Sequence, residues 1–121
     1  MAWKARMNNL EKQRIRNKMA NLIRPMNRHR DCLYWNAGET DATILMKLEI
    51  AKYLKKNGLE FYSECIFENG SRADFLVADG QFIIEVLDSE KPENIIEKQK
   101  RYPLPIRSVN ANQKFTEKLI Q

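Results

Sequence analysis

The stretch from Arg72 to Leu87 constrains the fold more than any other part of the sequence. It contains two short, mostly apolar runs separated by Asp79-Gly80. Asp-Gly is a favoured pair for the two-residue loop of a β-hairpin, because both central residues of a type I′ turn need a positive φ. The sequence therefore predicts two antiparallel strands joined by a tight turn.

This turn sets which residues of the two strands lie opposite each other. Asp74 falls directly opposite Glu85, and Arg72 falls opposite Leu87. Because side chains alternate along a strand, one face of the hairpin is expected to be apolar and the other to carry the charges. The expected apolar face consists of Ala73, Phe75, Val77, Phe82, Ile84 and Val86, and the opposite face consists of Arg72, Asp74, Leu76, Ile83, Glu85 and Leu87.

The two facing carboxylates, Asp74 and Glu85, need an explanation. Directly opposite residues have Cβ atoms about 5 Å apart, and like charges at that distance destabilise a sheet. Either one carboxyl group is protonated or a cation lies between the two, and a hard divalent cation prefers such oxygen ligands. The plainer alternative is two exposed acids at the frayed end of a hairpin, and the hairpin by itself does not distinguish these interpretations.

Charge is distributed unevenly along the 121 residues. Residues 1–30 contain nine Lys or Arg and one acid, whereas residues 31–121 contain twelve Lys or Arg and fifteen acids. A basic segment joined to a neutral or acidic body is typical of proteins that bind a polyanion, and we expect nucleic acid, DNA rather than RNA. The candidate phosphate-contacting residues are Lys4, Arg6, Lys12, Arg14, Arg16, Lys18, Arg24, Arg28 and Arg30.

The apolar spacing predicts the remaining elements. A basic helix is expected in residues 1–24, either as a helix with a solvated polar face that packs on the body or on a second copy, or as a phosphate-contacting arm, and the two are compatible. Trp3, Met7, Leu10 and Met19 could supply part of the contact to a second copy. A second helix is expected from Thr40 or Asp41 to Asn57, with an apolar face of Ile44, Leu48, Ala51 and Leu54. A strand over 59–67, the hairpin, a helix from about 91 or 92 to 102, a strand over 106–109 and a helix over 112–120 follow.

These elements give an α/β (α+β) fold. Three consecutive strands form an antiparallel meander and the fourth joins through a helical crossover, so we expect a mixed central sheet flanked by helices. We divide the chain into a basic N-terminal helical arm, residues 1–35, and a domain of residues 36–121.

The sequence offers no sign of export or membrane insertion. No apolar run approaches the ~20 residues of a membrane span, and the start lacks the apolar region of a signal peptide. Two cysteines, Cys32 and Cys65, are too few for a disulfide framework. We therefore expect reduced thiols in a cytoplasmic protein.

The order of elements and the positions of the acids resemble the PD-(D/E)xK nuclease superfamily over roughly residues 40–110. Its members have a restriction-endonuclease-like αβββαβ core, in which a helix acid, an Asp that opens the second strand and an Asp or Glu in the third strand hold one or two divalent metals. The resemblance implies that Glu49, Asp74 and Glu85 bind Mg²⁺ or Mn²⁺, with the carbonyl oxygen of Val86 as a further ligand.

The sequence departs from the superfamily at one position. Members carry a Lys two residues after the last acid, where it is taken to activate the attacking water and to offset charge at the scissile phosphate, but this chain has Leu87. Candidate replacements are Arg72, across the hairpin, and Lys52, one turn after Glu49, followed by Lys98 and Gln99 on the helix after the hairpin. Arg72 could clamp a phosphate but cannot act as a base, and a simple ion pair with the acids is the alternative.

Two functions fit these residues, and a third explanation stays open. The Arg-Ala-Asp at Arg72 and the Glu-Val after two isoleucines look like small archaeal and viral members, including junction-resolving enzymes. The resemblance implies a metal-dependent endonuclease that hydrolyses phosphodiester bonds of DNA, including branched DNA, as a homodimer, since one site cuts one strand. The alternative is a nuclease fold that has lost its chemistry and serves as a nucleic-acid-binding or assembly module. An unrelated α+β protein with a coincidental acid pair is the third.

Overall fold

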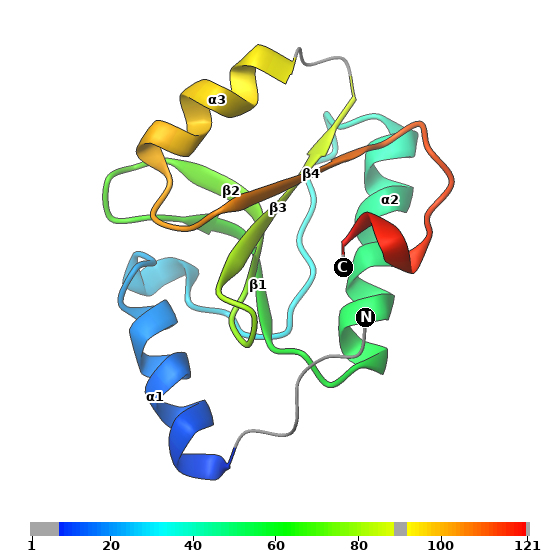
Figure 1. Ribbon diagram of the computed structural model, residues 1–121. Coiled ribbons are helices and arrows are strands. Elements are labelled where there is room, and N and C mark those ends of the chain that lie inside the picture. Colours follow the sequence, from blue (N-terminus) through cyan, green and yellow to red (C-terminus); the bar gives the residue numbers. More distant parts are fainter. Residues whose placement is uncertain (1–7, 89–91, 121) are drawn as a thin grey trace.

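The computed structural model describes residues 8–88 and 92–120. Trp3, Lys4, Arg6 and Met7, which the sequence placed in a basic helix, lie outside these residues. The described residues form a mixed sheet with helices on both sides (Figure 1). In chain order the elements are α1 (Asn9–Ala20), α2 (Asp41–Lys56), β1 (Phe61–Ile66), β2 (Arg72–Val77), β3 (Phe82–Leu87), α3 (Pro92–Arg101) and β4 (Ile106–Asn110), with 3-10 turns at Pro25–Asn27 and Glu117–Leu119.

The sheet has the strand order β1-β2-β3-β4. The first three strands are antiparallel neighbours, whereas β4 runs parallel to β3 and is reached through α3. A parallel neighbour needs a crossover connection of this kind, and α3 provides it. The predicted α+β class, with a mixed sheet flanked by helices, is confirmed.

The predicted pairing of the hairpin strands is confirmed from the turn to Phe75 and Ile84, and the register does not extend to the predicted pairs Asp74–Glu85 and Arg72–Leu87. Phe75 lies opposite Ile84, and Val77 lies opposite Phe82. The alternation of side chains follows from this register, and Phe75, Val77, Phe82 and Ile84 all pack in the core beneath α2.

The turn itself differs from the predicted type I′ loop. Gln81 has a φ of 53°, whereas neither Asp79 nor Gly80 has a positive φ. The backbone N–H of Gln81 donates to the carbonyl oxygen of Ala78 at 3.2 Å, so the loop between the two strands comprises the four residues 78–81. The Asp79 side chain accepts the backbone N–H of Glu60 at 2.6 Å, and this bond to the start of β1 holds the loop in a shape that the local sequence did not indicate.

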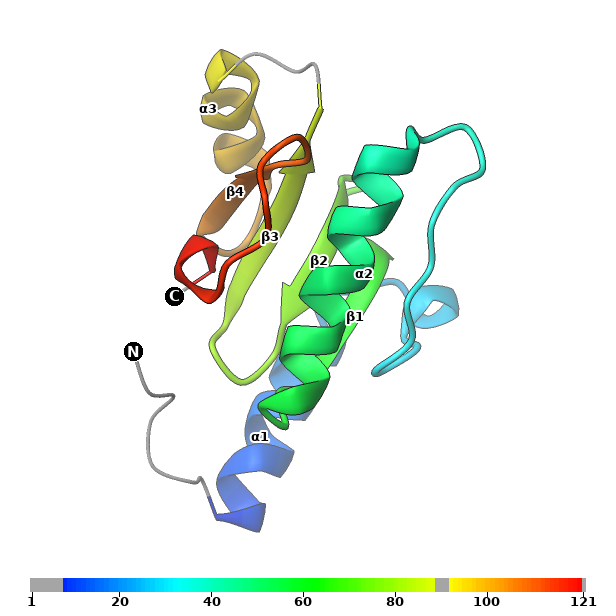
Figure 2. The same ribbon diagram turned by 90° about the vertical axis from the view of Figure 1, so that its right-hand side faces the viewer.

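Both faces of the sheet are buried. α2 lies on one face, and α3 and the C-terminal end of α1 lie on the other (Figure 2). The Thr40 side chain caps α2 by accepting the N–H of Thr43 at 3.3 Å. The core under α2 includes Ile50, Leu54, Phe61, Phe75, Val77, Phe82, Ile84 and Val86, and the second core includes Met19, Ile23, Tyr62, Cys65, Phe67, Ala73, Leu76, Ile83 and Tyr102.

The end of α1 belongs to the body of the protein. Met19 and Ile23 are both 0% exposed in the second core, and Ile23 forms a β-bridge with Phe67. The end of the N-terminal helix thus packs on the body, one of the two arrangements that the sequence left open for it. Met19 fills the core of its own chain and therefore does not supply the predicted contact to a second copy, whereas Leu10 is exposed.

The side chains of β1 and β2 switch from one face of the sheet to the other partway along the strands. Glu64 has a φ of 47°, which is uncommon for a residue other than glycine, and the ladder is interrupted there between the pairs Ser63–Phe75 and Cys65–Ala73. The strict alternation of side chains ends at this point. Ala73, predicted to share a face with Phe75, lies instead in the second core.

The predicted helix over 112–120 is wrong apart from its last turn, Glu117–Leu119. The Asn110 side chain accepts the N–H of Asn112 at 2.8 Å, and the Asn110 carbonyl accepts the N–H of Gln113 at 3.2 Å. Asparagine side chains compete in this way with helical hydrogen bonds. The segment still closes the core under α2, where Ile120 is 0% exposed.

Candidate active site

A cavity of about 410 Å³ lies between the N-terminal end of α2, β2 and β3, and α3. Its position follows from the fold, because the cap of α2 and the far end of β3 are joined where the Thr40 hydroxyl donates to Asp88 at 2.6 Å. The lining is rich in charge. Its charged side chains are Glu39, Lys47, Arg72, Asp74, Glu85, Asp88 and Lys98, and Val86 lies among them.

Asp74 and Glu85 interact in this cavity, one position beyond the last paired residues of the hairpin, Phe75 and Ile84. Asp74 Oδ2 accepts the backbone N–H of Val86 at 2.8 Å, which ties β2 to β3. Glu85 is only 3% exposed, and the Tyr102 hydroxyl donates to its Oε1 at 2.7 Å. Burial, together with the charge and hydrogen bond of Asp74, raises the pKa of Glu85 to about 8. A proton on Glu85 thus accommodates the carboxylate pair at neutral pH.

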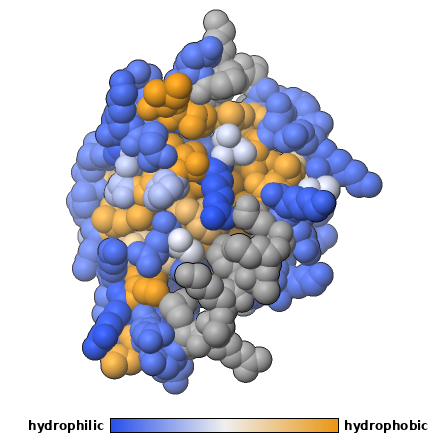
Figure 3. Space-filling view, viewed as in Figure 1, coloured by the Kyte–Doolittle hydropathy of each residue, from blue (hydrophilic) through white to orange (hydrophobic). Residues whose placement is uncertain are grey.

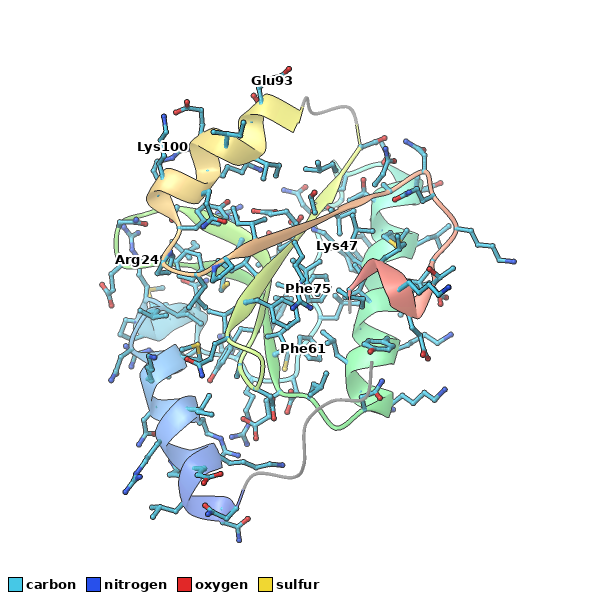
Figure 4. All side chains as sticks on the ribbon, in the orientation of Figure 1. Arg24, Lys47, Phe61, Phe75, Glu93 and Lys100 are labelled. Carbon is cyan, nitrogen blue, oxygen red and sulfur yellow. The ribbon has the colours of Figure 1, made fainter. Side chains whose placement is uncertain are left out.

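Lys47 enters the cavity from α2 and is the most deeply buried cation in the described part of the chain. It is 1% exposed, and its Nζ lies 2.8 Å from Glu39, 2.5 Å from Glu64 and 3.2 Å from Asp74. Figure 4 shows it between α2 and the sheet. Burial lowers the pKa of its ammonium, but the three carboxylates outweigh that effect and raise the pKa above its ordinary value. Lys47 is therefore a fixed positive charge.

Lys47 and its partners Glu39 and Glu64 were not among the predicted site residues. One signal was present: Lys47 lies on the stripe of α2 that contains Thr43, Ile50 and Leu54, all of which are buried. A lysine at core spacing is rarely buried unless it is paired with acids, so its position could have indicated a buried ion pair.

Glu49 and Lys52 are not in the cavity, and their assignment to the site is wrong. They pair with each other at 3.7 Å, with side chains 45% and 64% exposed. Two positions along a helix correspond to about 200° around its axis, so Glu49 and Lys47 point to opposite sides. The acid that shares Lys47 with Asp74 on this side of the cavity is Glu39, which lies just before α2.

The error has a physical reason. α2 carries apolar residues on almost every side, so their spacing does not settle which side faces the sheet. The predicted face included Leu48, which is 44% exposed, whereas Met46 and Ile50 are buried. The true buried stripe is rotated from the predicted one, and Glu49 turns outward with Leu48.

Arg72 and Lys98 line the α3 side of the cavity. The Tyr102 hydroxyl, whose single proton is donated to Glu85, also contacts the Arg72 carbonyl oxygen, and Lys98 Nζ lies 3.9 Å from Glu85 Oε1. The structure therefore brings together four of the predicted site residues, Arg72, Asp74, Glu85 and Val86.

The predicted nucleic-acid contacts on α1 lie at the other end of the hairpin. Arg16 binds both carboxylate oxygens of Glu60, with Nε 3.2 Å from Oε2, and this hydrogen bond lowers the pKa of Glu60. The Lys18 ammonium donates to Gln81 at 3.1 Å. Gln81 is in the β2–β3 turn, roughly 15 Å along the strands from Asp74 at ~3.3 Å per residue. These cations do not reach the cavity.

Comparison with protein-family models, with curated proteins and with solved structures yields no match for this chain. None of the helices in residues 8–88 and 92–120 is long and apolar enough to cross a membrane. Function must therefore be inferred from the chemistry of the cavity.

The donor set of the cavity fits a hard cation only in part. Among the described residues, no group of three or more His, Cys, Asp or Glu side chains is arranged to hold a metal ion, and the predicted triad with Glu49 is not assembled. Asp74 and Glu85 still offer two carboxyl groups. Mg²⁺ is commonly held by one or two carboxylates and completes its shell with water, so this pair matches the minimum that such an ion needs.

Proposed function

We propose that this protein is a divalent-metal-dependent nuclease with a restriction-endonuclease-like core, and that it hydrolyses phosphodiester bonds of DNA in the cavity between α2 and α3. The observation that carries the proposal is the grouping of Asp74 and Glu85 on adjacent strands with a buried ammonium, Lys47, 3.2 Å from Asp74. Two carboxylates and a fixed cation around one cavity suit the binding of a metal and the charge of a phosphate.

Asp74, Glu85 and the Val86 carbonyl oxygen would hold Mg²⁺ or Mn²⁺. The ion, when bound, lowers the pKa of a water molecule and neutralises charge on the phosphate. Glu85 must then give up the proton that it holds beside Asp74, so metal and proton compete for the same carboxyl group. The Tyr102 hydroxyl, which donates to Glu85 at 2.7 Å, fixes the orientation of that group.

Lys47 supports the proposal because it supplies the cation that Leu87 cannot. It approaches Asp74 from α2, whereas the superfamily lysine projects from the third strand. Its raised pKa keeps it charged, so it would orient water or offset phosphate charge and would not act as a base. On the opposite side of the cavity, the Arg72 guanidinium could form a charge-assisted hydrogen bond to a phosphate oxygen.

The test is cleavage of supercoiled plasmid and of branched DNA in Mg²⁺ or Mn²⁺, with variants of the cavity compared with a matched control. Asp74→Asn and Glu85→Gln should each lower the rate by at least about a hundredfold. Glu49→Gln removes a carboxylate of the same chain outside the cavity and should retain the wild-type rate. Cleavage that persists in Asp74→Asn, or a wild type that cleaves neither substrate, would overturn the proposal.

A second candidate function is a nuclease-fold module that binds nucleic acid without cutting it. The observation that favours it is that the Lys47 ammonium already contacts Asp74, Glu64 and Glu39 and so neutralises the cavity without a metal. Calorimetric titration with Mn²⁺ separates the two candidates. Heat of binding that disappears in Asp74→Asn supports the nuclease, and DNA binding without any metal-binding heat supports the module.

A further inference from the structure

The cavity has two sides of opposite charge. On the α2 side, Glu39, Asp88 and the buried Lys47 line it, with Lys47 paired to Glu39 at 2.8 Å, so the acids of this side outnumber its cation. The Asp88 carboxylate accepts hydrogen bonds from Thr40 at 2.6 Å and from Asn112 at 3.2 Å. On the α3 side, Arg72 and Lys98 line it. An anionic polymer is repelled by the first side and attracted by the second, so the charge determines the direction of approach.

The positive side continues beyond the cavity. Asn69, in the β1–β2 turn, donates to the backbone carbonyl of Arg101 at 2.7 Å, which joins this turn to the end of α3. The Arg24 guanidinium lies against the same turn, since a Cβ added to Gly70 would be 3.4 Å from its Nη2. Figure 4 shows Arg24 and Lys100 along one edge of the molecule, and the space-filling view shows hydrophilic surface there (Figure 3).

We name this edge the basic rim. Its cations are Arg24, Arg72, Lys98, Lys100 and Arg101, and all but the half-buried Lys98 are exposed.

The acids near the basic rim do not cancel its charge. Glu97 pairs with Lys100 at 3.3 Å, but both side chains are about two-thirds exposed, at 69% and 67%, and such pairs are weak in water. Glu68 is exposed in the β1–β2 turn, and Glu93 lies at the far end of α3 (Figure 4). Lys98 also lies 3.9 Å from the buried Glu85, so the five cations of the basic rim meet three neighbouring acids, Glu68, Glu85 and Glu97.

We propose that the sugar-phosphate backbone of a DNA duplex lies along the basic rim and enters the cavity from the α3 side; this inference rests on the proposed nuclease function. The contacts are to phosphates and carry no base preference. The α1 cations that the sequence singled out play a smaller part, because Arg16 and Lys18 are bonded to Glu60 and Gln81 at the other end of the hairpin.

The test measures equilibrium binding of a short fluorescent DNA duplex in EDTA, so that no cleavage occurs. The rim variant carries Arg24→Glu, Lys100→Glu and Arg101→Glu. The matched control carries Lys52→Glu, Lys55→Glu and Lys56→Glu on the exposed side of α2 and has the same net charge. We expect the rim variant to bind the duplex at least about tenfold more weakly. The slope of log K against log salt concentration should become shallower by about 0.9 for each phosphate that is no longer neutralised. The control should change about twofold, through net charge alone.

A third variant, with Lys12→Glu, Arg14→Glu and Lys18→Glu, tests α1 in the same assay and should lose less affinity than the rim variant. Equal losses in the rim variant and the α2 control, or a larger loss in the α1 variant, would overturn the inference. Thermal unfolding of each variant checks its fold, and the corresponding Gln substitutions on the basic rim give the same comparison with a smaller change in charge.

The failure of this inference can be told apart from the failure of the proposed function. If the wild type cleaves DNA in Mg²⁺ and the rim variant keeps wild-type affinity, the basic rim is not the DNA-binding surface but the nuclease proposal stands. If affinity depends on the basic rim but the protein never cleaves DNA, the nuclease proposal is wrong but the duplex still binds on the basic rim.

Discussion

The two ends of the β2–β3 hairpin hold charged side chains in different surroundings. At the turn, Arg16 and Lys18 bind Glu60 and Gln81 near the surface, where water screens such pairs. At the cavity, Lys47 and Glu85 are 1% and 3% exposed, and their pKa values are raised. Charges at the turn join α1 to the sheet, whereas the buried charges at the cavity interact strongly enough to shift one another's pKa values.

The largest effect is expected for Lys47→Met at pH 7. The substitution keeps most of the side-chain volume but leaves Glu39, Glu64 and Asp74 without their cation, and breaking a buried ion pair typically costs about 3–5 kcal/mol. Urea denaturation monitored by circular dichroism measures the free energy of unfolding. The turn-end change Arg16→Met is the control and should cost clearly less. Equal losses for the two variants would contradict the contrast between the two ends.

Glu85 should make stability depend on pH. Its carboxyl group holds a proton in the folded protein up to about pH 8 but loses it at about pH 4.3 when unfolded. The stability contributed by this group is therefore complete at acid pH and is lost as the pH rises toward 8. Denaturation in EDTA across this range should show a steeper decline for the wild type than for Glu85→Gln. If the stability of the two proteins declined equally with pH, the Glu85 carboxyl group would not be the cause of the decline.

Glu64 and Gln81 offer a matched pair, because both have a left-handed backbone, with φ of 47° and 53°. Glu64→Gly relieves the backbone but removes a carboxylate 2.5 Å from Lys47. Loss of a hydrogen bond to a buried charge costs about 1.5–3 kcal/mol, which exceeds the relief of about 1 kcal/mol. We expect net destabilisation in urea denaturation. An increase in stability would show that the contact between Lys47 and Glu64 contributes less to the fold than the backbone strain costs.

The smallest effect is expected for Gln81→Gly at the turn. Only an exposed hydrogen bond to Lys18 is removed there, while the left-handed conformation becomes favourable, so the variant should be more stable by about 0.5–1 kcal/mol. Thermal and urea unfolding measure this gain. Destabilisation similar to that of Glu64→Gly would mean that the turn carries more of the fold than its hydrogen bonds indicate.

Local patterns predicted much of the hairpin and its acids. The Asp79-Gly80 pair and the alternation of apolar residues specified the register that β2 and β3 adopt from the turn to Phe75 and Ile84, and Asp74 and Glu85 come one position further along each strand. The same local pattern predicted the wrong turn. The Asp79 side chain accepts a hydrogen bond from the backbone N–H of Glu60, a residue that is far away in the sequence and lies just before β1.

The cation of the candidate site could not be assigned from the same kind of pattern. Lys52 was chosen because it follows Glu49 by one turn, but both face solvent. Which side of α2 meets the sheet depends on the whole core, since apolar residues lie all around that helix. Packing selected the side that contains Met46, Ile50 and Leu54, and Lys47 was buried with it.

The sequence by itself determined the order of the strands and the pairing of the hairpin from its turn to Phe75 and Ile84, because these depend on turn residues and on alternation over a few positions. The tertiary structure alone decided that Glu39, Glu64 and Lys47 meet Asp74, and that the basic rim joins Arg24 to α3. These residues come from separate segments, and their meeting depends on the packing of α1, α2 and α3 against both faces of the sheet.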